Sequence, residues 1–175
     1  MEAQDTHEIR EQTSRPTIGL LVTWLRDGYE NGFLLGVADA AAALDVNLIC
    51  LVGGELRWNV PQTVVFDLIG PEKFDGLIIS GTLGHARAAE DLARFCARFA
   101  PLPMVGGALP LPGMVQVLPE SLSGMREAVE HLITVHGYRR IAFIQGPAGQ
   151  LEAEERYRAY TEVLLRHGLP LDPAL

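Results

Sequence analysis

Four short apolar runs, each followed by a break and then by helical periodicity, constrain this chain more than any other feature. The runs are TIGLLVT, VNLICLV, FDGLIIS and LPMVG, at residues 17–23, 46–52, 74–80 and 102–106. They lack the apolar–polar alternation of a half-exposed strand, which is typical of parallel strands buried on both faces. Because helical segments separate them, the pattern predicts an α/β fold with a doubly wound parallel sheet and right-handed crossovers.

The helices are expected at residues 30–44, 61–69 and 86–99. The first carries apolar residues at three- and four-residue spacing, namely Phe33, Leu34, Val37, Ala41 and Leu44. The second has Pro61 in its first turn, where proline is tolerated. The proline-rich stretch 110–119 then breaks the rhythm, and it predicts an extended crossover with a short strand at residues 114–117.

A second unit is expected after this crossover. A helix over residues 120–136, capped in the region of Ser121 and Ser123, should end at Gly137, because glycine adopts the left-handed conformation without penalty. The apolar run IAFI at residues 141–144 predicts a strand buried on both faces. A glycine–proline turn follows, and residues 151–167 return to helical spacing.

These elements divide the chain into a polar tail at 1–16, an N-terminal α/β lobe at 17–118 and an incomplete second lobe at 119–175. Two helices and one strand are too few to bury a sheet of their own. The pattern therefore suggests part of a longer protein. The alternative is that the last three elements join the first sheet and form one continuous five-stranded domain.

Composition excludes several classes of protein. The formal net charge of −8 opposes binding of a nucleic-acid backbone by this chain alone, since such binding needs clustered basic residues. No apolar run is long enough to span a bilayer, and the first 16 residues are too polar for a signal peptide, so we expect a cytoplasmic protein without membrane contact. Cys50 and Cys96 lack a paired spacing and are interpreted as packing thiols.

Ligands of open parallel sheets bind beyond the carboxyl ends of the strands. That rule nominates residues 23–26, 53–55, 80–85, 107–108 and 146–150. Trp24 beside Arg26 is the most suggestive pair, because an aromatic face with nearby polar donors suits a sugar or nucleoside. Trp24 packing against the next helix is the alternative. The turn Gly81–Gly84, with Thr82 and Leu83, either cradles an anion at a helix N-terminus or forms an ordinary loop.

The stretch HLITVHGYRRIAFIQGP at residues 131–147, followed by Arg156 in ERYRAY, resembles the LacI-type sugar-binding regulators and their periplasmic-binding-protein-like relatives. The resemblance implies two α/β lobes joined by crossovers, with a small-molecule effector between them. It also implies that Arg156 hydrogen-bonds the ligand, for which a guanidinium fork is suited. An ion pair of Arg156 with Glu152 is the alternative.

The sequence departs from the family pattern at two places. Glu120-Ser121 and Gly124 stand where the family has Asp-Asn and, three residues later, Gly. Gly107-Ala108 follows the fourth strand, where the family often carries an aspartate directed at the sugar. Ala108 is retained as a ligand-site candidate, and the pocket is expected to accept a sugar-like or another small molecule.

We expect no catalytic residues, no metal and no cofactor. The histidines are scattered, and His131 and His136 lie five apart, a spacing that does not place both rings on one helical face. His85, Ser80 and Asp75 lack a nucleophile elbow. The leading hypothesis is an effector-sensing domain, either the core of a LacI-like transcriptional regulator or the sensor of a fused signalling protein.

The alternatives are a nucleotide- or phosphosugar-handling enzyme and a transport solute-binding protein. A homodimer is expected, with DNA bound only through a domain outside this chain. Leu92, Phe95 and Phe99 are candidates either for the dimer surface or for the core.

Overall fold

The computed structural model describes residues 15–26, 28–56, 61–84, 89–108, 111, 113–147 and 150–172. Two compact units divide between Leu118 and Pro119. The tail expected at 1–16 lies outside the described residues except for Arg15 and Pro16. No helix in the described part of the chain is long and apolar enough to cross a membrane.

The first unit is built on a five-stranded, entirely parallel sheet with the order β2-β1-β3-β4-β5. The strands are β1 (Thr17–Val22), β2 (Asn47–Val52), β3 (Gly76–Ser80), β4 (Met104–Gly107) and β5 (Val115–Val117). The doubly wound parallel sheet predicted from the apolar runs is therefore confirmed. The fifth strand comes from the proline-rich crossover, so the alternative in which the last 57 residues complete this sheet is wrong.

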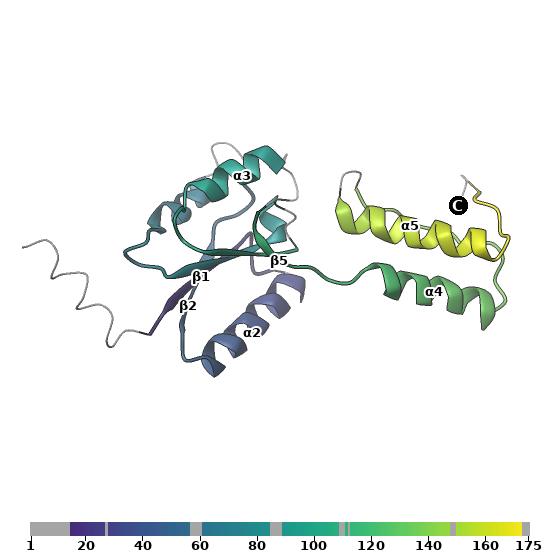
Figure 1. Ribbon diagram of the computed structural model, residues 1–175, viewed down its shortest axis with the longest axis horizontal. Coiled ribbons are helices and arrows are strands. Elements are labelled where there is room, and N and C mark those ends of the chain that lie inside the picture. The colour runs from purple at the N-terminus through teal and green to yellow at the C-terminus, as the bar shows by residue number, and fades with distance from the viewer. Residues whose placement is uncertain are drawn as a thin grey trace, which may run out of the picture. The chain divides into compact units, whose positions relative to one another are not determined.

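Helices cover both faces of the sheet (Figure 1). The elements η2 (Pro61–Leu68), η3 (Gly81–Gly84) and α3 (Ala89–Ala97) follow β2 and β3, whereas α2 (Gly28–Ala43) follows β1. The short helix expected at 61–69 is present as a 3₁₀ helix. The start expected for the third helix, residues 86–88, lies outside the described residues.

The main core includes strand side chains and the inward faces of η2 and α3. Phe66, Phe95 and Phe99 form edge-to-face contacts in it, with ring centroids 5.4 and 5.0 Å apart. Leu92, Phe95 and Phe99 are all at most 8% exposed. These residues were considered either for the core or for a dimer surface. The dimer surface is wrong, because their side chains are buried in the core between α3 and the sheet.

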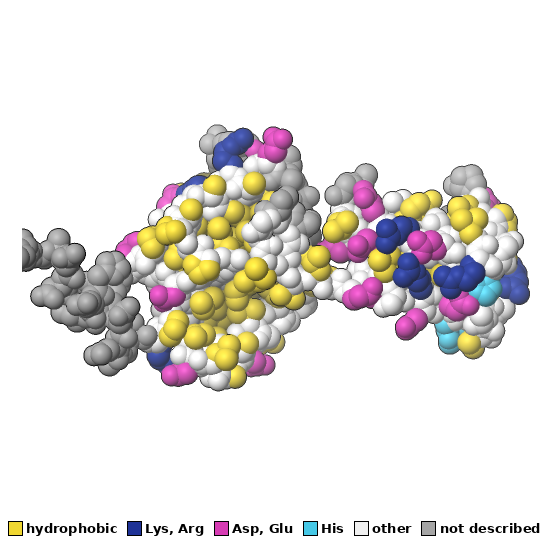
Figure 2. Space-filling view, viewed as in Figure 1, with side chains coloured by type: hydrophobic (Ala, Val, Ile, Leu, Met, Phe, Trp, Pro, Cys, Tyr) yellow, Lys and Arg dark blue, Asp and Glu magenta, His cyan; other side chains and the backbone are white. Residues whose placement is uncertain are grey.

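Helix α2 is less buried than the spacing of its apolar residues indicated. Only Glu30 and Ala41 are buried in it, and Leu44, expected on its inner face, is 74% exposed. An apolar groove of about 380 Å³ runs between α2 and the strands, lined among others by Phe33, Val37 and Leu48. Figure 2 shows apolar side chains gathered over this part of the unit.

The second unit is a pair of helices, α4 (Leu122–Thr134) and α5 (Leu151–Arg166), that pack side by side (Figure 1). Their shared core is Val129, Ile133, Tyr160, Val163 and Leu164. The helix end expected near His136–Gly137 is found slightly earlier, at Thr134, and Gly137 has the expected left-handed backbone with φ of 68°. At its other end Glu120 accepts the Leu122 and Ser123 N–H groups, whereas the expected cap residue Ser121 makes no side-chain capping bond.

The segment at residues 141–144 is not a strand, and the prediction that it is buried on both faces is wrong. Ile141 and Phe143 pack against the helices, but Ile144 is 98% exposed. Tyr160 Oη donates a 2.8 Å hydrogen bond to the Ile141 carbonyl, and the Phe143 ring stacks on Tyr160. A strand needs a hydrogen-bonded neighbour, and the described residues of this unit provide none.

Candidate functional site

A cavity of about 700 Å³ opens beyond the carboxyl ends of β1 and β2. Its lining residues are Thr23, Trp24, Leu25, Arg26, Val52, Gly54, Glu55 and Gln62. This is where parallel sheets bind ligands, because strand ends and helix N-termini leave polar backbone groups there. Trp24 and Arg26 both line the cavity, and the Trp24 side chain is 38% exposed. Trp24 is therefore partly accessible at the wall of the cavity.

Both acidic and basic groups line this cavity. Arg26 and Glu55 supply opposite charges, and the Gln62 amide at the start of η2 adds both a donor and an acceptor. Such a set hydrogen-bonds neutral polyhydroxyl compounds well. Glu55 was nominated only as part of a loop, and Gln62 was missed, because its position beside Gly54 depends on how η2 packs against the end of β2.

A polar cluster lies next to the cavity, where β1 and β3 end and the strand order reverses. Glu30 in the first turn of α2 is fully buried and accepts a 3.0 Å hydrogen bond from Ser80 Oγ. Thr82 Oγ1 also donates to the Glu30 carboxylate. Thr23 Oγ1 lies 2.7 Å from Thr82 Oγ1, which extends the network to the cavity wall.

Sequence reasoning did not identify Glu30 as a site residue. The available signal was an acidic residue in the first turn of the helix after the first strand, a position that usually reflects the helix dipole. Only the β1–β3 pairing shows that this carboxylate faces two hydroxyl groups from another strand end.

The turn Gly81–Gly84 is a short 3₁₀ segment. The Thr82 hydroxyl is held by Glu30, and the Leu83 side chain is 1% exposed within the core. Only the Leu83 backbone is therefore left to face a ligand. Because the Glu30 carboxylate lies beside Thr82, a negatively charged ligand is disfavoured here.

Ala108 adopts a left-handed backbone with φ of 54°, directly after β4. Its carbonyl oxygen lies so close to Gly81 that a Cβ built on Gly81 would stand 2.2 Å from it. Gly81 is required there because no larger residue fits against that backbone. The Ala108 N–H donates to the Val117 carbonyl at 2.9 Å, so β5 helps hold this turn.

Arg156 lies on α5 in the second unit, where it is half-buried. Within the described residues it makes no ion pair, so the alternative pairing with Glu152 is not formed. By contrast, its neighbour Arg158 lies 3.6 Å from Glu162, and Arg126 donates to the same carboxylate at 2.7 Å. The Arg126 hydrogen bond is the main reason that the pKa of Glu162 lies below its ordinary value.

Two further nominated loops remain. Gly54 of the loop after β2 lines the cavity, whereas His85 and residues 148–149 lie outside the described residues.

Both cysteines are free thiols. Burial raises the pKa of Cys96 to about 11, which agrees with a packing role. Among the described residues no group of three or more possible ligand side chains is arranged to hold a metal ion.

Residues 15–174 match the family described as periplasmic binding proteins and the sugar-binding domain of the LacI family. The chain belongs to this family. The predicted relationship is thereby confirmed over nearly the whole chain, and so is the periplasmic-binding-protein-like α/β fold.

Known transcriptional regulators resemble the chain at 24–27% identity. The HTH-type transcriptional regulator DegA of Bacillus subtilis is 25% identical over 114 residues, which cover 65% of this chain and 34% of DegA. A LacI-family regulator from Sanguibacter keddieii is 27% identical with a TM-score of 0.67, covering 91% of this chain and 54% of that one. The regulator CelR in its cellobiose complex has 24% identity and a TM-score of 0.70, covering 97% and 52%.

The chain thus spans about half the length of these solved structures and about a third of DegA. DegA and the Sanguibacter protein are both described as transcriptional regulators. They favour the prediction that the chain is not an enzyme over the alternative of a nucleotide- or phosphosugar-handling enzyme.

Proposed function

We propose that this chain is the effector-sensing part of a LacI-family transcriptional regulator and that it binds a neutral, sugar-like molecule. The observation that carries the proposal is the cavity at the ends of β1 and β2, lined by Trp24, Arg26, Glu55 and Gln62. An indole covers the apolar C–H face of a pyranose, while the charged and amide groups hydrogen-bond its hydroxyls. The family description as a sugar-binding domain supports the same chemistry.

Arg156 is the proposed contact from the second unit. It is half-buried and makes no ion pair in the described residues, so its guanidinium remains available for ligand hydroxyl groups. Thr82, Leu83 and Ala108 are proposed to contribute chiefly backbone groups at the ends of β3 and β4. Ligand binding would then favour a closed arrangement of the two lobes over an open one.

The proposed output is transcriptional, with DNA contacted by a domain outside these residues and a homodimer as the working unit. DegA and the solved relatives favour a regulator over a sensor in a fused signalling protein. The cytoplasm is the proposed location, since the bacterial regulators that it resembles act there. A homodimer would show twice the chain mass in light scattering after size exclusion.

Thermal unfolding with a panel of neutral mono- and disaccharides, cellobiose included, tests the proposal. A ligand at about 100 times its Kd should stabilise the folded state by about 2.7 kcal/mol, seen as a rise in Tm. Trp24→Ala and Arg156→Ala should remove that rise. Arg158→Ala is the matched control on α5, because Arg158 already lies near Glu162.

If Trp24→Ala and Arg156→Ala retained the ligand-dependent rise of the unaltered chain, the proposed site would be wrong. Sugar phosphates serve as a second panel. A larger rise with these than with neutral sugars would contradict the expectation that Glu30 disfavours anions.

A further inference from the structure

Two imidazole rings come together at the end of α4. Neither residue is part of the proposed effector site. His131 Nε2 and His136 Nε2 lie 3.1 Å apart, and the ring centroids are separated by 4.8 Å at an interplanar angle of 76°. Both residues are exposed. The five-residue spacing does not place both rings on one face of a helix, yet the rings meet here because His136 lies outside α4.

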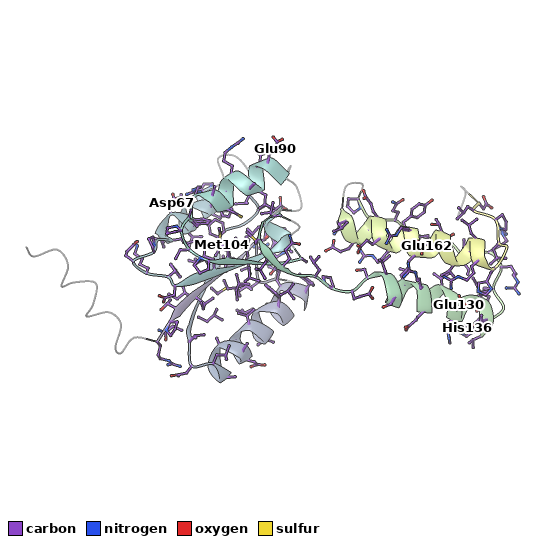
Figure 3. The ribbon with its side chains drawn as sticks, in the orientation of Figure 1. Asp67, Glu90, Met104, Glu130, His136 and Glu162 are labelled. Atoms are coloured by element: carbon purple, nitrogen blue, oxygen red, sulfur yellow. The ribbon has the colours of Figure 1, made fainter. Side chains whose placement is uncertain are left out.

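The reason is that the helix ends between the two residues. The last helical residue is Thr134, and the N–H groups of Val135 and His136 both donate to the His131 carbonyl, at 2.9 and 3.4 Å. This tightened end of the helix brings the His136 ring beside His131, and the left-handed Gly137 follows it. Figure 3 labels His136 at this end of the helix.

Tyr138 fixes the position of the second ring. Its N–H donates to the Leu132 carbonyl at 3.1 Å, which closes the turn, and its ring stacks on His136 with a centroid distance of 5.4 Å and an interplanar angle of 14°. His131 is fixed independently, because it belongs to α4. The two nitrogens are therefore held together by the backbone and by stacking, and not only by their mutual hydrogen bond.

We propose that His131 and His136 form a two-histidine site for a divalent transition-metal ion, with Zn²⁺ as the probe. Two Zn–N bonds of about 2.0–2.1 Å to nitrogens 3.1 Å apart enclose an angle of roughly 100°, between octahedral and tetrahedral values. Imidazole nitrogen is a preferred ligand of zinc, copper and nickel.

Water completes the coordination of this site. The neighbouring carboxylate Glu130 is engaged elsewhere, since its Oε1 lies 2.6 Å from His167 Nε2 and its Oε2 lies 3.7 Å from Arg166. Without metal, one ring donates an Nε2–H to the other. With metal, both rings carry their proton on Nδ1. Replacing the hydrogen bond by two metal bonds therefore moves one proton from Nε2 to Nδ1 of the same ring and releases none.

Zinc titration of the whole chain tests the site, with binding followed by calorimetry and histidine nitrogens followed by ¹⁵N NMR. The Nε2 signals of His131 and His136 should shift together and saturate at one equivalent of Zn²⁺. His131→Gln and His136→Gln each remove a direct ligand, so each should lower the zinc affinity by roughly tenfold or more. Removing a residue that only hydrogen-bonds a metal ligand already has an effect of that size. His167→Gln is the control, because that ring is held by Glu130.

Retention of wild-type zinc affinity in His136→Gln would overturn the proposal, as would zinc shifts that involve only one ring of the pair. His136 lies beyond the helix and is exposed, so its substitution leaves the helical core intact, and circular dichroism checks this. If His131→Gln perturbs α4, the His136 variant and the wild-type NMR shifts decide the question. The outcome is independent of effector binding, which is measured separately with sugars.

Discussion

Glu30 is the residue whose environment differs most from what its place in the sequence indicates. Its carboxylate is fully buried between α2 and the end of β3, and it accepts hydrogen bonds from Ser80 and Thr82. Hydrogen bonds to a charged group stabilise more than bonds between neutral groups. The cluster therefore fastens the first turn of α2 to the strand ends that border the cavity.

Replacing Ser80 tests this role. Ser80→Ala removes the 3.0 Å donor to Glu30 and should lower the free energy of unfolding by about 1.5–3 kcal/mol, measured by urea denaturation. Asp39→Asn, on the exposed side of the same helix, is the control and should change stability by no more than about 0.5 kcal/mol. Equal effects of the two substitutions would show that the buried network adds nothing to stability.

At the scale of elements, the second unit is held together by the packing of α4 on α5, since its described residues form no sheet. The two helices share a small apolar core, and the segment after α4 covers part of it with Ile141 and Phe143. Adjacent leucines on α5 have opposite environments, since Leu164 is 2% exposed and Leu165 is 63% exposed. This contrast makes a matched pair of substitutions possible.

Leu164→Ala should destabilise the second unit by roughly 2–5 kcal/mol, because it deletes buried methyl groups and leaves a cavity. Leu165→Ala should change stability by less than about 0.5 kcal/mol. Hydrogen exchange resolved by segment is the measurement. Protection should fall in α4 and α5 only, while β1 to β4 retain theirs. A uniform loss over both units would mean that they unfold as one.

The Arg126–Glu162 pair links the same two helices and depends on pH. Arg126 donates to Glu162 and lowers the pKa of that carboxyl from 4.5, so the ionised form is favoured in the folded state. The stabilisation is complete above pH 4.5 and is lost as pH falls through the lowered folded-state pKa. It is expected to be small, because both side chains are partly exposed.

Glu162→Gln should therefore lower Tm slightly at pH 7 and flatten the fall of Tm between about pH 5 and pH 3 relative to wild type. Thermal unfolding followed across this pH range is the measurement. Glu127→Gln on α4 provides the comparison, since no ion pair of Glu127 is formed among the described residues. A wild-type slope in Glu162→Gln would contradict the assignment.

At the scale of the whole molecule, charge limits what the chain can bind by itself. A net charge of −8 repels a nucleic-acid backbone, and the described arginines on α4 and α5 are interspersed with carboxylates (Figure 2). A regulator built on this chain would consequently depend on another domain for contact with DNA. The effector-sensing part and the DNA-reading part would then be separable activities.

Fluorescence anisotropy with a labelled DNA duplex measures this directly. At physiological salt the 175-residue chain should bind more weakly than ordinary non-specific DNA-binding proteins, whose Kd values are about 10⁻⁴–10⁻⁶ M. Lowering the salt concentration should restore little affinity, because the net charge of −8 repels the DNA backbone. Tight, strongly salt-dependent binding would contradict the proposed division of labour.

The amino-acid sequence alone determined the local features of this protein. Apolar runs and helical spacing predicted four strands correctly, the crossover predicted the fifth, and Gly137 predicted the end of α4, because these signals depend on neighbours in the chain. The cavity residues Trp24 and Arg26 followed from the rule for strand ends, which needs only the strand boundaries.

Tertiary structure decided where distant groups meet. Gln62 reaches the cavity through the fold of η2, and Glu30 meets Ser80 through the pairing of β1 with β3. His136 returns to His131 because a turn, and not a helix, follows Thr134. Residues 141–144 have the composition of a strand, but the described residues of their unit offer no strand beside them. Strand formation requires hydrogen bonds from a second segment, and periodicity within one segment cannot supply them.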